Sequence, residues 1–134
     1  MKNIITIQHT QSIHHTNGMV GSWTDWDLSE LGKQQAQTIG EKLAKEITDN
    51  KFVMYSSDLL RAKHTADIIG SYLKIEPIAT DALRERNLGK AVGKSVQWLR
   101  DNIECQEKTL MTECFRMQKA DEMFGTDCCL FIVE

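Results

Sequence analysis

Several features that define other protein classes are missing or scarce in this chain of 134 residues. No apolar run approaches the roughly 18 residues of a membrane-spanning helix, and one proline and no Gly/Ser-rich stretch leave no visible linker. The net charge of −3 argues against a nucleic-acid-binding surface, which is basic. The start, Met1 to Asn3, leads into a strand-like run without a signal-peptide cleavage site. We therefore expect one soluble, cytoplasmic domain over residues 1–134, with neither nucleic acid nor membrane as a partner.

Cysteine is present, but not in the spacing of a zinc or redox site. None of the four cysteines forms a C-x-x-C pair. Cys128 and Cys129 are adjacent within an apolar run, where a thiol behaves as a small hydrophobic side chain. We predict reduced core thiols rather than disulfides or metal ligands. The four residues are Cys105, Cys114, Cys128 and Cys129.

Short apolar runs alternate with helical periods along the chain. The runs predict strands over residues 4–7, 52–55, 75–79 and 128–133. Apolar residues at steps of three or four predict helices over 29–47, 58–73, 95–103 and 106–123, with the stretch 11–27 irregular. Ser29 is the expected N-cap of the first helix, and Ser57 or Asp58 that of the second. This alternation predicts an α/β fold with a mainly parallel sheet.

Polar residues follow the first two predicted strands. If these strands are parallel, their carboxyl ends share one rim, where such sheets bind ligands. Gln8, His9 and Thr10 follow the first strand; Ser57 and Arg61 follow the second. His9 is either a functional group at this rim or an end-of-strand histidine bonded to a neighbouring loop.

Two charged residues each allow a functional and a structural interpretation. Arg61 lies in the first helical turn, where the macrodipole disfavours a cation unless an anion binds there. An ordinary surface ion pair would also explain it. Glu85, between two arginines, is either a solvated carboxylate or a general acid.

The order of these residues along the chain is more specific than any one of them. Strand-His-Thr-Gln-Ser at the first rim is followed by Leu-Ser-Glu-Leu-Gly, then by Ser-Ser-Asp-Leu-Leu-Arg-Ala at 56–62, then by Leu-Arg-Glu-Arg-Asn-Leu-Gly. Over about residues 3–95 this order resembles the histidine phosphatase superfamily, the fold of the cofactor-dependent phosphoglycerate mutases. The resemblance implies a three-layer α/β domain.

The resemblance also implies a chemistry. His9 would attack phosphorus and become phosphohistidine, Arg61 would hold the phosphoryl oxygens, and Glu85 would protonate the leaving oxygen. The phosphate pocket would further include Gln8, His15 and Ser57. A small phosphorylated substrate is expected, with no metal or organic cofactor.

Three departures from the family pattern put activity in question. Gln8 replaces an arginine of the phosphate pocket, His15 replaces an asparagine, and no histidine follows His64. Residues 127–133 resemble the late strand after which the family places a second histidine. We expect a shortened fold that lacks the C-terminal elements. It would be either a phosphatase, of full or of weak activity, or an inactive member that binds a phosphorylated ligand or a protein.

The histidines allow further interpretations. His14 or His15, if protonated, would return positive charge to the pocket, or both are simply exposed loop residues. His9, His14 and His15 could also be metal ligands, but their loop shows no fourth ligand, so we expect no metal.

Two expectations concern surfaces. In the family the late strand lies between the first and second strands, and the strands expected to be missing here would have flanked the first strand. The first strand would therefore be left as an unpaired edge. Such edges tend to pair with another chain, so we predict a homo-oligomer, most simply a two-fold dimer. In the loop 18–27, Trp23 and Trp26 either stack on a substrate or, as we favour, close the apolar side of the domain.

Overall fold

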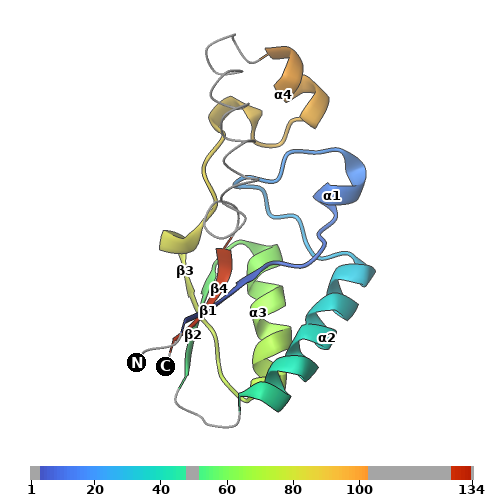
Figure 1. The fold of residues 1–134 in the computed structure, drawn as a ribbon. Helices are drawn as coiled ribbons and strands as arrows, with labels where there is room; N and C mark the ends of the chain where they lie inside the picture. The colour runs from blue at the N-terminus through green and yellow to red at the C-terminus, as the bar shows by residue number, and fades with distance from the viewer. Residues whose placement is uncertain (1–3, 48–51, 103–127, 134) are drawn as a thin grey trace.

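The computed structural model of the chain describes residues 4–47, 52–102 and 128–133. A four-stranded sheet carries two long helices, and shorter helices and turns gather beyond one end of it (Figure 1). The strands are β1 (Ile4–Gln8), β2 (Val53–Ser57), β3 (Ile78–Thr80) and β4 (Cys128–Val133). The helices are α1 (His14–Asn17), α2 (Glu30–Glu46), α3 (Leu60–Leu73) and α4 (Val96–Asn102), with 3-10 turns η1 (Asp81–Leu83) and η2 (Gly89–Ala91).

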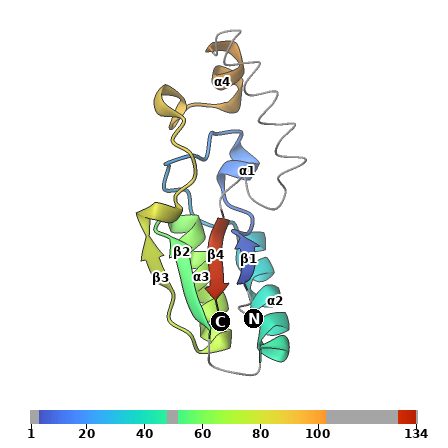
Figure 2. The same cartoon turned by 60° about the vertical axis from the view of Figure 1, so that its left-hand side comes forward.

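The strand order is β1-β4-β2-β3, and β4 runs against the other three strands (Figure 2). β4 pairs antiparallel with both β1 and β2, and β2 pairs parallel with β3. The expected position of the last strand between the first two is therefore confirmed. Three of the four strands run in the same direction, as expected of a mainly parallel sheet, but the reversed β4 makes two of the three neighbouring pairs antiparallel. β1 and β2 still point the same way, so their carboxyl ends share one rim.

The core lies between the sheet and the helices α2 and α3. Met54 of β2 is fully buried against Ala66 and Ile69 of α3, and Ile7 of β1 packs on this cluster. Alternate strand positions face away from the helices, and they expose apolar side chains. These are Ile4 at 63%, Val53 at 44% and Tyr55 at 38% exposure. Both views show α2 and α3 on the same face, so the described residues supply two of the three expected layers.

The two long helices begin in different ways. Ser29 caps α2 as predicted, since its hydroxyl accepts the backbone N–H of Gly32 at 3.1 Å. The predicted cap of α3 by Ser57 or Asp58 is wrong, because Leu59 is the N-cap residue and makes no side-chain cap bond. The carboxylate of Asp25, from a distant loop, accepts the N–H of Leu60 at 3.1 Å instead. A carboxylate there also suits the helix dipole.

The loop after β1 packs tightly on the start of α2. A Cβ placed on Gly32 would lie 1.9 Å from the carbonyl oxygen of Gln11, so only glycine allows this approach. The stretch 11–27 is not wholly irregular, because it contains α1.

Other predictions have mixed outcomes. The predicted weak strand at 75–79 is observed as β3, and the helix predicted at 95–103 is observed as α4. The helix expected at 106–123, together with Cys105 and Cys114, lies outside the described residues. In the described part of the chain, no helix is long and apolar enough to cross a membrane.

Candidate active site

The rim shared by β1 and β2 brings together three of the predicted residues. His9 follows β1 and is 6% exposed, and Arg61 in the first turn of α3 is fully buried. The Nε–H of Arg61 donates to Nε2 of His9 at 3.2 Å, and its Nη2 contacts the Glu85 carboxylate at 2.8 Å. Residues separated by 52 and 24 positions thus form one polar cluster at the rim.

The contacts of His9 determine its tautomer. Its Nδ1 lies 2.7 Å from the carbonyl oxygen of Thr10, and a carbonyl can only accept. Arg61 can only donate, so Nε2 must accept. The proton therefore sits on Nδ1, and the lone pair of Nε2 faces the cluster. An imidazole nucleophile needs this form.

The guanidinium of Arg61 is held on several sides. Its Nη1 donates to the carbonyl of Thr24 and its Nη2 to that of Ser22, both at 2.9 Å. Its charge is balanced by Glu85, whose side chain is 23% exposed. A fully buried cation requires such compensation. Because the two carbonyl acceptors belong to the loop 18–27, this loop defines the position of the arginine.

A second set of contacts ties the Glu85 loop to the same loop 18–27. The indole N–H of Trp23 donates to the carbonyl of Glu85 at 2.7 Å. The buried hydroxyl of Ser22 donates to the carbonyl of Arg86 at 3.0 Å and accepts the N–H of Leu88 at 2.9 Å. Trp23 is 44% exposed, so it is not the apolar closure that the sequence favoured. The general-acid candidate is thus positioned by loop residues 62 or more positions away.

An ion pair supports this arrangement from the other side. The guanidinium of Arg84 donates two bonds to the Asp58 carboxylate and lies 4.8 Å from the centre of the Trp23 ring. The Arg84 hydrogen bond holds the pKa of Asp58 below its ordinary value. Asp58 therefore anchors the Glu85 loop to the start of α3 rather than capping that helix.

A contact between two further side chains fixes the end of the loop 18–27. His64 of α3 lies 2.6 Å from the Asp27 carboxylate, which also accepts the N–H of Leu28. Desolvation would raise the pKa of Asp27, but the bonds from Leu28 and His64 outweigh it and lower the pKa.

The remaining predicted residues lie around this cluster. Gln8 is exposed and, with His9, lines a cavity of about 520 Å³ beside α2. The ring of His15 stacks on that of His9, with centroids 5.3 Å apart and planes 7° from parallel. Ser57 is buried, and its hydroxyl accepts the N–H of Leu59 at 3.3 Å. Its observed contact is thus with the start of α3.

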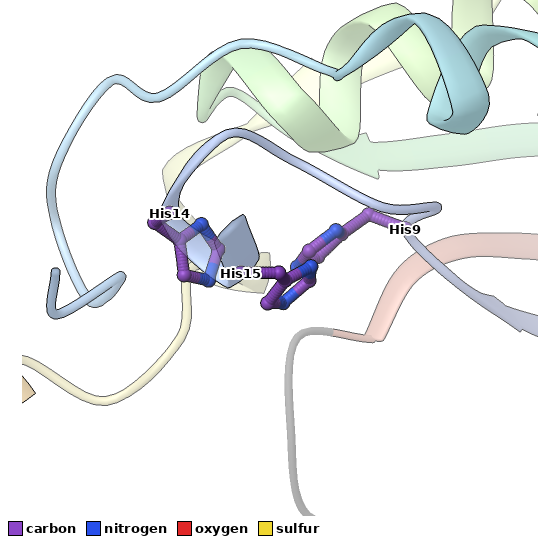
Figure 3. A group of neighbouring side chains, drawn as sticks. All are labelled: His9, His14 and His15. Atoms are coloured by element: carbon purple, nitrogen blue, oxygen red, sulfur yellow. The ribbon is translucent and has the colours of Figure 1, made fainter. Parts of the chain in front are cut away.

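Three histidines adjoin at this rim. One ring nitrogen from each of His9, His14 and His15 lies within 4.8 Å of the others, so among the described residues these three side chains are close enough together to hold a metal ion (Figure 3).

Sequence reasoning missed the residues that support the cluster. No local pattern marks Ser22, Asp25 and Thr65, because they act through contacts with distant segments. Trp23 was singled out, but its hydrogen bond to the Glu85 carbonyl was not predicted. The hydroxyl of Thr65, for example, lies 3.3 Å from the backbone nitrogen of Thr10 and helps fix the turn after His9.

A strand-end imidazole, a buried arginine and a carboxylate thus meet at one rim of this α/β fold. Residues 4–119 match the family model of the histidine phosphatase superfamily (branch 1). The chain belongs to this superfamily, as its motifs predicted.

The curated relatives match most of this chain. The matched part is less than half of each relative's own length. Phosphoglycerate mutase-like protein 4 of Arabidopsis thaliana is 36% identical over 91 residues, which is 67% of this chain and 39% of that protein. The metal-independent phosphoserine phosphatase of the same plant is 35% identical over 91 residues, or 67% of this chain and 37% of that protein.

Solved structures also match most of this chain but only about half of their own length. A mycobacterial glucosyl-3-phosphoglycerate phosphatase in complex with VO₃ superposes with a TM-score of 0.67 at 28% identity, covering 80% of this chain and 50% of that one. The phosphoserine phosphatase of Entamoeba histolytica, solved with 3-phosphoglyceric acid, gives a TM-score of 0.65 at 26% identity and covers 83% of this chain and 52% of that one. This chain therefore spans about half of each matched fold.

Proposed function

We propose that the chain hydrolyses a small phosphomonoester through a phosphohistidine on His9. The observation that carries the proposal is the orientation of His9, whose Nε2 lone pair faces Arg61, the residue that also binds the Glu85 carboxylate. The relatives' names, phosphoserine phosphatase and glucosyl-3-phosphoglycerate phosphatase among them, support a phosphorylated small molecule as the substrate class.

The reaction has two steps. Nε2 of His9 attacks phosphorus while the bond to the leaving oxygen breaks, and Glu85 gives that oxygen a proton. Water then attacks the phosphohistidine, Glu85 takes a proton from the water, and inorganic phosphate leaves with His9 restored. Arg61 turns its Nε–H from Nε2 to a phosphoryl oxygen, where its charge stabilises the transition state.

Glu85 must be protonated to act as the acid, although Arg61 beside it favours the carboxylate. An arriving phosphate dianion takes over the charge of Arg61 and repels a second negative charge. Both effects favour the protonated carboxyl group at the time when it is needed.

Gln8 limits the expected rate. Its amide is neutral where the family motif has an arginine, and losing one charged donor costs about 2–4 kcal/mol of transition-state stabilisation by analogy with an oxyanion-hole donor. This same substitution favours a second candidate function. A member without turnover would bind a phosphorylated ligand or a protein partner and leave it unchanged.

The test is hydrolysis of para-nitrophenyl phosphate from about pH 5 to 8, for the native chain, His9→Ala and Glu85→Gln. His64→Gln is the matched control, because His64 lies outside the cluster and the amide retains a donor for Asp27. We expect turnover that disappears in His9→Ala, falls in Glu85→Gln and persists in His64→Gln. Folded protein without turnover in any form would support the binding-only candidate. Equal turnover in all four would overturn the mechanism.

We also propose that the chain is a two-fold homodimer. β1 is an edge of the described sheet, and the sheet face turned away from α2 and α3 exposes apolar side chains. An edge strand can pair with its own copy, which satisfies its backbone groups, and the exposed apolar face, which includes Val53, can pack against the partner chain.

A further inference from the structure

Three of the four histidines of the chain meet at the carboxyl end of β1. His9 follows the strand, His14 and His15 open α1, and the three rings lie together in Figure 3. Three imidazoles with an open fourth position form a common zinc ligand set. We propose that His9, His14 and His15 bind one divalent transition-metal cation of the zinc type, and that this cation blocks His9 as a nucleophile. The second part rests on the proposed function.

The hydrogen bonds of the rings indicate which nitrogens would bind. Nδ1 of His9 donates to a backbone carbonyl, a contact that orients many metal-binding histidines and leaves Nε2 as the ligand. Nδ1 of His14 contacts the hydroxyl of Ser12, so this ring would bind the cation through Nε2. Nδ1 of His15 accepts the N–H of Ser12 at 3.2 Å, so this ring must turn to present a lone pair.

The required movement is small and falls on the more accessible rings. Ligand nitrogens on a tetrahedral zinc ion are about 3.3 Å apart, given bonds of about 2.0–2.1 Å, so the observed 4.8 Å limit must shorten. His9 is buried, whereas His14 is half-buried and His15 is exposed. Ring rotations of the last two can close the distance while His9 stays in place. Gly21 adjoins the His14 ring, and a Cβ there would lie 2.7 Å from its Nε2.

The ligand set determines the kind of cation. Imidazole nitrogens prefer zinc, copper, nickel and cobalt, whereas magnesium and calcium prefer oxygen ligands. The cation would bind the lone pair of His9 Nε2, which is the pair that attacks phosphorus. Metal binding and phosphorylation of His9 are therefore mutually exclusive, and Arg61 gives up its bond to Nε2 in either case.

Binding is tested on the purified chain with Zn²⁺ alone, by competition with a chromophoric chelator, and with Mg²⁺ as the comparison cation. We expect one Zn²⁺ per chain and no Mg²⁺. His14→Gln and His15→Gln should each weaken Zn²⁺ binding tenfold or more, as the loss even of supporting groups does at metal sites. His64→Gln should bind as the native chain does. Circular dichroism checks that each variant is folded. Absence of Zn²⁺ binding, or an equal loss in His64→Gln, would overturn the site.

The four cysteines are the competing ligands, and two further readouts separate them from the histidines. Alkylating the thiols should leave Zn²⁺ binding unchanged, and bound Co²⁺ should show no thiolate charge-transfer band. A band, or loss of binding on alkylation, would assign the metal to cysteine instead.

The blocking role is tested by hydrolysis of para-nitrophenyl phosphate. Zn²⁺ should inhibit the native chain, a chelator should restore it, and His14→Gln should require about tenfold more Zn²⁺. Inhibition at equal Zn²⁺ in both forms would overturn the blocking role. A chain that binds Zn²⁺ as expected but never hydrolyses the substrate would contradict the proposed function and leave the metal site established.

Discussion

Replacing Ser22 by alanine should destabilise the protein far more than the loss of one exposed hydroxyl. Ser22 is 1% exposed, and its hydroxyl serves the carbonyl of Arg86 at 3.0 Å and the N–H of Leu88 at 2.9 Å. Alanine leaves both backbone groups without this partner in a part-buried position. Each such group costs about 1–2 kcal/mol, so we expect the free energy of unfolding to fall by about 2–4 kcal/mol.

The assay is urea denaturation, with Ser71→Ala as the matched control. Ser71 is exposed and donates to the carbonyl of Ile68 within its own helix, so its loss should change the unfolding free energy by less than about 0.5 kcal/mol. If Ser22→Ala and Ser71→Ala are equally stable, the loop 84–88 is not held by Ser22 and the argument fails.

The same substitution has a kinetic consequence if the proposed function is correct. Loosening the loop displaces Glu85 but leaves the Ser22 carbonyl available to Arg61. A misplacement of about 1 Å can cost on the order of 100-fold in rate, so kcat should fall more than KM changes. Trp23→Phe, which removes only the indole donor to the Glu85 carbonyl, should act in the same direction with a smaller effect. A fall in stability with unchanged kcat would limit Ser22 to a structural role.

Three further predictions follow from the fold. Because Arg84 lowers the pKa of Asp58 from its ordinary 3.8, their ion pair should contribute its full stability above about pH 5 and lose it as the pH falls further. The urea midpoints of Asp58→Asn and of the native chain should therefore converge in acid. A difference that stays constant with pH would contradict this prediction. The pair is partly exposed, so the difference at neutral pH should be about 1 kcal/mol or less. Gly32→Ala should lower the melting temperature and reduce the free energy of unfolding by about 1–3 kcal/mol, because the added Cβ meets the Gln11 carbonyl. An unchanged melting temperature would show that the loop after β1 moves aside readily. Sedimentation should show a dimer at tens of micromolar that Val53→Lys weakens, and a monomer alone in the native chain would refute the dimer.

The sequence predicted local elements well and long-range contacts poorly. Apolar steps of three or four located α2 and α3, and Ser29 was recognisable as a cap because its hydroxyl bonds only three residues ahead. The direction of β4 was not readable from its own residues, since an apolar run has the same pattern in a parallel or an antiparallel pair. The prediction of the α3 cap failed for a similar reason, because the Asp25 carboxylate binds the N–H of Leu60, which lies 35 positions away in the sequence.

The site shows the same division. His9 and Arg61 could be predicted to meet, because parallel strand ends share a rim whatever lies between the strands. Glu85 joined them only through the resemblance, since it lies on a loop without a periodic pattern. The contacts of Ser22 and Trp23 with that loop depend on the tertiary fold, and single residues in irregular segments carry no signal of them. Among the predicted pocket residues, Ser57 makes its observed contact within the helix start.

The attachment of the Glu85 loop to Ser22 and Trp23 affects how this protein could be redesigned. In α/β enzymes, exchanging a surface loop is a usual route to a new substrate, because loops vary while the scaffold remains. Here the loop that borders the cluster also carries the backbone acceptors of Arg61 and the donor to Glu85. A chimaera that imports only residues 18–27 from a relative would bring new neighbours to both groups at once. Segments 18–27 and 84–88 must therefore be transplanted as a pair, even though they are far apart in the sequence.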